Sequence, residues 1–315
     1  MTIHPESILF WAGTGALARY GTLVRRTTPD APAPAFQRAG PATFFGRDGR
    51  ARQAAAGRPR VESLDLDGDG VREAGVLLLE AGRGNVLFDS SNFAPAGTAW
   101  TGEASFTLEP VASLIDGQTA YKHTNLGASS FRSRSQLRGV FTGSPETFYA
   151  IIENVDATES ALSIFDDATD THVCRARLVW STGAASVALG SGSVYAERLA
   201  ATGPNGGPVW LLAVTAAGTA GNARMAVLYP TGVGTNTQSA IIHHAQYEEA
   251  PFHSSPIVTT ASAGATRAAD GFVQPFGHAP QAMTLYVRFV DLGTGLGGGS
   301  QGVFYIGDAA RAGLP

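Results

Sequence analysis

The feature that most constrains the fold of this chain is a series of short strand-like segments between residues 105 and 247. About ten segments, rich in β-branched and aromatic residues, are separated by turn signals such as Gly143-Ser144-Pro145 and Asn205-Gly206-Gly207. The segments are 105–108, 136–141, 147–153, 161–165, 173–180, 186–189, 194–199, 209–214, 223–229 and 239–247. No stretch has convincing helical periodicity. The pattern predicts an all-β protein whose main unit is an antiparallel β-sandwich.

Length, composition and charge limit the number of domains and the class of protein. A chain of 315 residues can form two or three domains, each with its own core. It is 44% hydrophobic and 15% charged, which favours a folded chain over a disordered one. The net charge of -4 provides no excess of cations to neutralise phosphates, so we expect no binding to nucleic acid.

The chain divides into four predicted regions. Residues 1–41 contain a Pro/Ala-rich segment and are expected to form an extended N-terminal arm. Residues 42–90 are expected to form a small β- and turn-rich attachment region. Residues 91–270 hold the sandwich. Residues 271–315 begin a further β module that is too short to be complete, so either the chain continues in a longer protein or these strands add to another sheet.

Two segments of the chain contain ordered motifs. The first includes Ala42-Thr43-Phe44-Phe45, Arg47-Asp48-Gly49-Arg50, Pro59-Arg60, Leu77-Leu78-Leu79-Glu80 and Arg83-Gly84-Asn85-Val86-Leu87. The second includes Ala245-Gln246-Tyr247-Glu248-Glu249, Pro256, Thr259-Thr260 and Thr266-Arg267-Ala268-Ala269-Asp270. Together they resemble a recurring leader of bacteriophage virion proteins, found in tail-fibre, head-fibre and minor tail components. The segments 283–289 and 301–307 are similar to the first strands of a concanavalin A-like module.

This resemblance implies a jelly roll similar to carbohydrate-binding modules, in a non-enzymatic fibre, spike or decoration protein. It further implies contact with other virion proteins (capsid, portal or tail), a homo-oligomer that in this family is often a trimer, and a host-surface glycan as ligand. One alternative is a secreted bacterial glycan-binding or glycan-cleaving protein. The other is a virion assembly scaffold with no ligand.

The expected location is the virion, after synthesis in the host cytoplasm. The N-terminus, Met1-Thr2-Ile3-His4-Pro5-Glu6, lacks the basic start and long apolar core of a signal peptide. No apolar stretch approaches the roughly 18 residues of a membrane span, so we expect no insertion into a membrane.

An acidic turn is the one candidate cofactor site. Asp65, Asp67 and Asp69 precede Gly70, in the spacing of the first half of a calcium-binding loop, and Glu73 occupies the ninth position. The twelfth position holds Val76 instead of a bidentate Glu. Calcium is therefore a candidate ligand, with a solvated acidic turn as the alternative, and we expect no other cofactor.

Aromatic residues near loops are candidates for glycan binding, because a sugar ring stacks on an exposed Trp or Tyr. Trp100 and Tyr121 lie nearest to predicted loops and are the expected ligand-binding pair. The alternative is that they fill the sandwich core, as most aromatic residues of such folds do.

We expect the remaining reactive side chains to have structural roles. Cys174 is the only cysteine and is expected to be a buried thiol. His243 and His244 are adjacent in a predicted strand, so one should be buried and the other exposed. Acidic residues near loops, such as Glu153 and Asp166, could serve glycoside hydrolysis. Since loop acids are usually only solvated and no nucleophile or phosphate-binding motif is present, we expect no catalytic residues.

Overall fold

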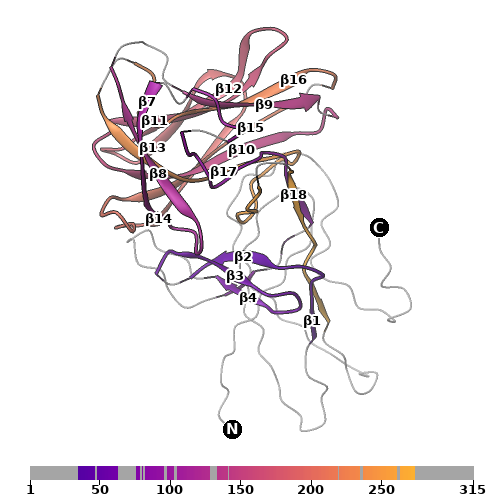
Figure 1. Cartoon of the computed structure of the whole chain (residues 1–315). Helices are drawn as coiled ribbons and strands as arrows, with labels where there is room; N and C mark the ends of the chain where they lie inside the picture. Colours follow the sequence, from indigo (N-terminus) through magenta and orange to yellow (C-terminus); the bar gives the residue numbers. More distant parts are fainter. Residues whose placement is uncertain are drawn as a thin grey trace, which may run out of the picture.

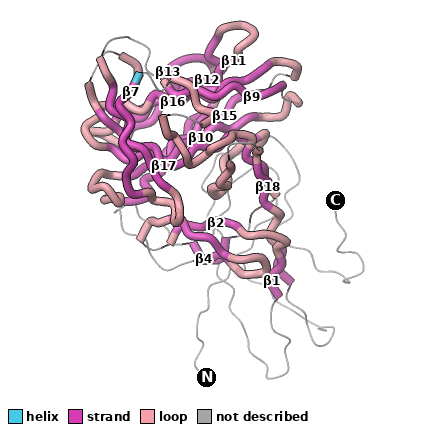
Figure 2. Tube along the Cα trace, viewed as in Figure 1, coloured by secondary structure: helices cyan, strands magenta, loops and turns pink. Residues whose placement is uncertain are grey.

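A computed structural model of the chain describes residues 35–46, 48–62, 76–78, 80, 82–95, 98–102, 105–127, 133–140, 142–218, 220–234, 237–260 and 263–273. Every named element in these residues is a β-strand, and Figure 2 shows only one short helical piece, beside β7, among the described residues. The predicted all-β fold is therefore confirmed.

Two antiparallel sheets form the sandwich (Figure 1). The first sheet has six strands, in the spatial order β14 (Ser193–Ala200), β15 (Val209–Ala216), β10 (Glu146–Asn154), β17 (Ser239–Glu248), β8 (Thr119–Asn125) and β7 (Phe106–Ala112). The second has five strands, in the order β13 (Ala184–Gly190), β12 (Thr171–Val179), β11 (Glu159–Asp166), β16 (Ala223–Tyr229) and β9 (Arg134–Val140). The predicted antiparallel sandwich, with its jelly-roll-like architecture, is thus present.

The main core lies between the two sheets. Strand β12 shows the alternation that builds it, because Cys174, Ala176 and Leu178 are buried in the core while Arg175 and Arg177 lie on the opposite face. Each fully buried Leu, Ile or Phe side chain contributes about 1.5–3 kcal/mol to this core.

Four two-stranded sheets form a further layer next to the sandwich (Figure 1). They pair β1 (Ala35–Gln37) with β19 (Gly271–Val273), β2 (Ala42–Phe45) with β3 (Ala51–Ala54), β4 (Arg60–Glu62) with β5 (Val76–Leu78), and β6 (Arg83–Asn85) with β18 (Ala265–Arg267). The β1–β19 pair joins residues predicted to lie in the first and last regions of the chain. Residues 1–34 and 274–315 are outside the described residues.

The central strands of the six-stranded sheet are buried on both faces. A second core on the outer face of this sheet contains Tyr149 and Ile151 of β10, Leu211 of β15, and Phe45 and Ala51 of the small β2–β3 sheet. Strand β17 is buried at every position, as is β10 from its start to Glu153. Such two-sided burial is usual where a further layer covers a sheet.

The prediction for the adjacent histidines is wrong, because both His243 and His244 are fully buried. Residue Ile151 of β10 pairs with His244, but the next residue, Ile152, pairs with Ile242. A β-bulge therefore adds one residue to β17 and interrupts the alternation of side chains. His243 accepts a hydrogen bond from the Leu114 N–H at 3.1 Å and His244 Nδ1 lies 2.8 Å from the Ser91 hydroxyl, so both imidazoles have buried partners instead of one reaching solvent.

Candidate functional site

The two motif segments meet in a buried network, which we call the junction network and define as Arg60, Glu80, Ser255, Arg267 and Asp270. The Glu80 carboxylate lies 2.6 Å from Arg60 Nη1 and 2.9 Å from Arg267 Nη1. It also accepts hydrogen bonds from the backbone N–H of Ser255 at 2.9 Å and from its hydroxyl at 2.7 Å. Asp270 accepts a hydrogen bond from the Glu80 backbone N–H at 2.8 Å and pairs with Arg60.

Two carboxylates compensate the buried charge of Arg60. Burial disfavours the charged form of Arg60, but the carboxylates of Glu80 and Asp270 outweigh that effect and raise the pKa of the guanidinium. The side chain of Arg60 is fully buried, and that of Glu80 is nearly so. An ion cluster of this kind makes its partners depend on one another, because removing one charge leaves the others buried and uncompensated.

The remaining motif residues extend the network toward β17. Asn85 donates to the carbonyl of Ile257 at 2.9 Å and accepts from the backbone N–H of Tyr247 at 3.2 Å. Glu248 accepts from the backbone N–H of Ser254 at 3.0 Å. The motif residues therefore hold three parts of the chain together, around residues 80, 250 and 270. This position supports a structural role for them.

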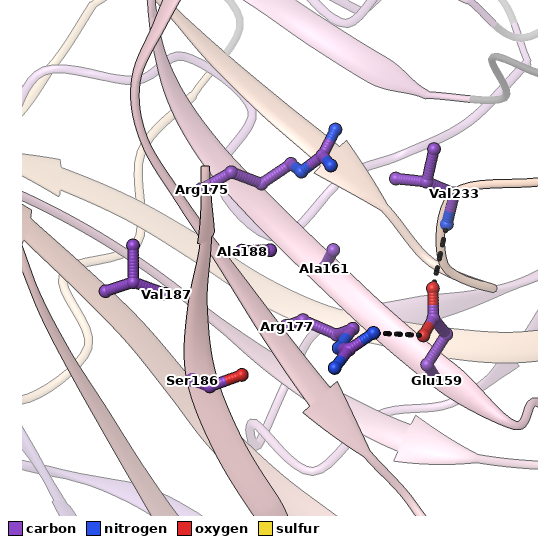
Figure 3. A pocket seen from close by; sticks show the side chains of 8 residues that line it. All are labelled: Glu159, Ala161, Arg175, Arg177, Ser186, Val187, Ala188 and Val233. Atoms are coloured by element: carbon purple, nitrogen blue, oxygen red, sulfur yellow. Dashed lines mark hydrogen bonds and ion pairs between the residues drawn. The ribbon is translucent and has the colours of Figure 1, made fainter. Parts of the chain in front are cut away.

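An open groove lies on the outer face of the five-stranded sheet, with a volume of about 430 Å³ (Figure 3). Strands β11, β12 and β13 form most of it, together with Val233 from the loop after β16. The residues lining it are Glu159, Ala161, Arg175, Arg177, Ser186, Val187, Ala188 and Val233. Two arginines and one carboxylate give the groove a net positive charge.

Both arginines of the groove are positioned by neighbours. The guanidinium of Arg175 lies over the Tyr229 ring, 5.9 Å from its centroid. Arg177 Nη1 lies 3.7 Å from Glu159 Oε2, and Glu159 also accepts a hydrogen bond from the Val233 backbone N–H at 3.3 Å. Arg177 remains 48% exposed. Two supported guanidinium groups on one strand face can bind carboxylate or phosphate oxygens.

The groove face differs from the outer face of the other sheet. Its buried apolar residues, Ala161, Val227 and Tyr229, are packed against half-buried residues such as Phe165 and Met225 of the same face. Leu189, at the edge of this sheet, is 44% exposed. The six-stranded sheet, by contrast, packs against β2 and β3. The two outer faces of the sandwich therefore have different surroundings.

The predicted glycan-binding pair needs one correction. Trp100 is 3% exposed, its ring lies 5.0 Å from that of Phe93, and its Nε1–H donates to the Asp89 carbonyl at 3.1 Å. A ring enclosed in this way has no free face for a sugar, so Trp100 is a core residue. Tyr121 on β8 is half-buried against the main core, and its ligand role stays a prediction.

The candidate calcium residues Asp65, Asp67, Asp69 and Glu73 lie outside the described residues. Within the part of the chain that the structure describes, no group of three or more His, Cys, Asp and Glu side chains is arranged to hold a metal ion. In the same part, no helix has the length and apolar character required to cross a membrane.

Two of the acidic residues considered for glycoside hydrolysis accept hydrogen bonds from the backbone of loops. Glu153 accepts hydrogen bonds from the backbone N–H groups of Asn205 and Gly207, each at 2.9 Å, and lies 3.1 Å from His243 Nε2. Burial opposes ionisation of Glu153, but these bonds outweigh it and lower the pKa of the carboxyl. Asp166 binds Arg224 at 2.6 Å and accepts from the Ala168 N–H at 3.0 Å. Cys174 is buried, as predicted.

Sequence reasoning missed the groove and the junction network. The alternation of Arg175 and Arg177 with buried residues signals that the arginines share a face, but it does not identify the strands beside them. No protein-family model matches the chain, and no curated protein matches it.

Proposed function

We propose that this chain is a non-enzymatic structural component of a bacteriophage virion, of the fibre, spike or decoration type. Its N-terminal region attaches to other virion proteins of the capsid, portal or tail, and its sandwich faces outward to bind host-surface glycans. The observation that carries the proposal is the junction network. Residues Arg60, Glu80, Arg267 and Asp270, which belong to the two motif segments resembling the virion leader, form one physically connected unit.

The unequal surroundings of the two sheets support the proposed division of roles. The outer face of the six-stranded sheet packs on β2 and β3, next to the junction network. The groove face belongs to the other sheet, on the far side of the sandwich (Figure 1). A protein attached through its N-terminal layer could therefore present the groove away from the attachment point.

The chemistry of the groove supports a glycan that carries acidic groups. Arg175 and Arg177 can bind a carboxylate or phosphate, and the Ser186 hydroxyl can exchange hydrogen bonds with sugar hydroxyls. The aliphatic side chain of Val233 offers apolar surface to the face of a sugar ring. Such contacts are individually weak, and several copies on one particle would strengthen them.

Immunogold electron microscopy tests the location. Antibody raised against the sandwich should label purified phage particles at a defined position, and mass spectrometry of those particles should detect the chain. Particles that lack the chain would contradict the virion assignment, whatever the sandwich binds.

A glycan array with the full chain tests the ligand. We expect binding to acidic glycans that is weakened at least tenfold in Arg175→Gln and Arg177→Gln and decreases with added salt. The matched control is Arg58→Gln, which removes an exposed arginine outside the groove and should leave binding unchanged. If the wild-type chain binds no glycan, the protein is an assembly scaffold without this ligand. If the groove variants bind as well as Arg58→Gln, the ligand site lies elsewhere.

A further inference from the structure

The two large sheets end in four edge strands, and these edges differ in how they are protected. An unprotected edge presents free backbone N–H and C=O groups to other strands, so proteins usually place charges, proline or a covering segment there. Strand β7 carries the exposed Glu109 and Pro110, and β14 carries Glu197 and the exposed Arg198.

Strand β9 is protected in a different way. Residue Thr101 forms two backbone hydrogen bonds with Ser135, at 2.9 and 3.2 Å, and so occupies part of the β9 edge. The Arg138 guanidinium lies 4.0 Å over the Phe88 ring and donates to the Val86 carbonyl at 2.9 Å. This edge is therefore covered and charged.

Within the described residues, no other segment pairs with the outer edge of strand β13. Six of its seven residues are exposed, and its sequence, Ala-Ala-Ser-Val-Ala-Leu-Gly, contains no charge and no proline. No charged residue occurs from residue 181 to residue 196. Val187 and Leu189 are 38% and 44% exposed. A bulge at Ala188 interrupts the pairing with β12, which leaves Ala184–Val187 as the regular part of the edge.

We propose that the β13 edge pairs with the β13 edge of a second copy of this chain, in antiparallel orientation. The pairing would join the two five-stranded sheets into one ten-stranded sheet about a two-fold axis. Because the same strand contributes both sides, the contact is isologous and closes at two copies. A pair differs from the trimers common in the family that the sequence resembles.

The side chains of β13 are compatible with pairing to the same strand of a second copy. Its small and uncharged side chains bring no like charges together when the strand faces itself. The cation beside the regular part of this edge, Arg177, is paired in register with Ser186. In the proposed pair two β13 strands separate Arg177 from its counterpart, a spacing of three strand intervals or about 14 Å. That distance exceeds the Debye length of about 8 Å at physiological salt, so repulsion is largely screened.

The proposed pairing would also enlarge the groove. Ser186, Val187 and Ala188 line it on the β13 side, so the second copy would extend the groove wall with its own β13. A two-fold axis perpendicular to the joined sheet places both grooves on the same face. This consequence rests on the proposed glycan binding, whereas the pairing itself does not.

Light scattering coupled to size-exclusion chromatography tests the pairing without any ligand. We expect the full chain to have twice its monomer mass, and Val187→Lys to halve it. The control is Leu137→Lys on β9, at a 51% exposed position of the opposite edge, which should remain a dimer. Circular dichroism confirms that each variant is folded. A wild-type chain that is monomeric over a wide concentration range, or a Val187→Lys variant with the wild-type mass, would overturn the proposal.

Cysteine cross-linking provides a second measurement. In a continuous sheet with this symmetry one residue of β13 must face its own counterpart. Single cysteines placed in turn at Ala184, Ala185, Ser186 and Val187, the regular part of the edge, should therefore include one variant that forms a disulfide-linked dimer on oxidation. Leu137→Cys should not, and neither should the wild-type chain, whose Cys174 is buried. If none of the four variants cross-links, the β13 edges do not meet.

Discussion

The carboxylate of Glu80 accepts two hydrogen bonds from Ser255, a residue 175 positions further along the chain. The backbone N–H of Ser255 donates at 2.9 Å and its hydroxyl at 2.7 Å. Arg60 and Arg267 pair with the same carboxylate. Glu80 therefore receives contacts from both motif segments, and its buried carboxylate links the small β layer to the segments that follow the last strand of the sandwich.

Replacing this anion should destabilise the protein strongly. In Glu80→Gln the arginines would stay buried with less negative charge, and we expect the free energy of unfolding to fall by about 3–5 kcal/mol. Urea denaturation followed by circular dichroism measures the change. Glu109→Gln is the control, because its partner Lys122 is 3.6 Å away and the Glu109 side chain is 63% exposed, so the loss should be below about 1 kcal/mol. Equal losses in the two variants would contradict the central role of Glu80.

Trp100 should behave as a core residue and not as a ligand platform. Trp100→Ala removes a ring that packs against Phe93, and we expect a loss of about 3–5 kcal/mol in unfolding free energy. Trp100→Phe keeps a ring at the position and should lose less. Thermal or urea denaturation of both variants provides the comparison. A Trp100→Ala variant with wild-type stability and no glycan binding would restore the ligand role.

The strands were largely predictable because their signals are local. The expected strands 147–153 and 239–247 correspond to β10 and β17, since runs such as Phe148–Ile152 combine β-branched, aromatic and other apolar side chains. The bulge at His243 was not predictable, because it depends on the register between β17 and β10. Alternation reports which side chains share a face only while the pairing stays regular.

The candidate sites were harder to predict, because they depend on contacts distant in sequence. Nothing near Arg60 in the chain indicates that Asp270 will neutralise it. The ligand role predicted for Trp100 from its proximity to a loop was also wrong, because Trp100 lies in the main core together with Phe93. The arginines of the groove were present in the alternating pattern, but their neighbours come from separate strands.

The lone thiol should be inert in the folded protein. Burial raises the pKa of Cys174 from 9.0 to about 11, so little thiolate is present near neutral pH, and the side chain is enclosed in the main core. We expect negligible reaction with a thiol reagent such as Ellman's reagent in buffer and one thiol per chain in denaturant. Rapid labelling in buffer would show that the core opens at β12.

Acid should destabilise the fold partly through His123. Burial, with a further contribution from the nearby Arg134, lowers the pKa of His123 from 6.5 to about 3. The unfolded chain therefore takes up a proton as the pH falls below 6.5, whereas the folded chain does not until about pH 3. Between these values the unfolded state binds one more proton, so the contribution of His123 to stability is full above pH 6.5 and decreases as the pH falls.

The variant His123→Phe isolates this effect. The imidazole lies edge-on to Phe93 and Phe106, with centroids at 5.9 and 5.4 Å, so a phenyl ring suits its surroundings. We expect the slope of unfolding free energy against pH, measured by urea denaturation from pH 5.5 to 4, to decrease by up to about 1.4 kcal/mol per pH unit relative to the wild type. The comparison of slopes does not depend on whether the substitution changes stability at neutral pH. Parallel curves for the two proteins would show that His123 is protonated equally in the folded and unfolded states.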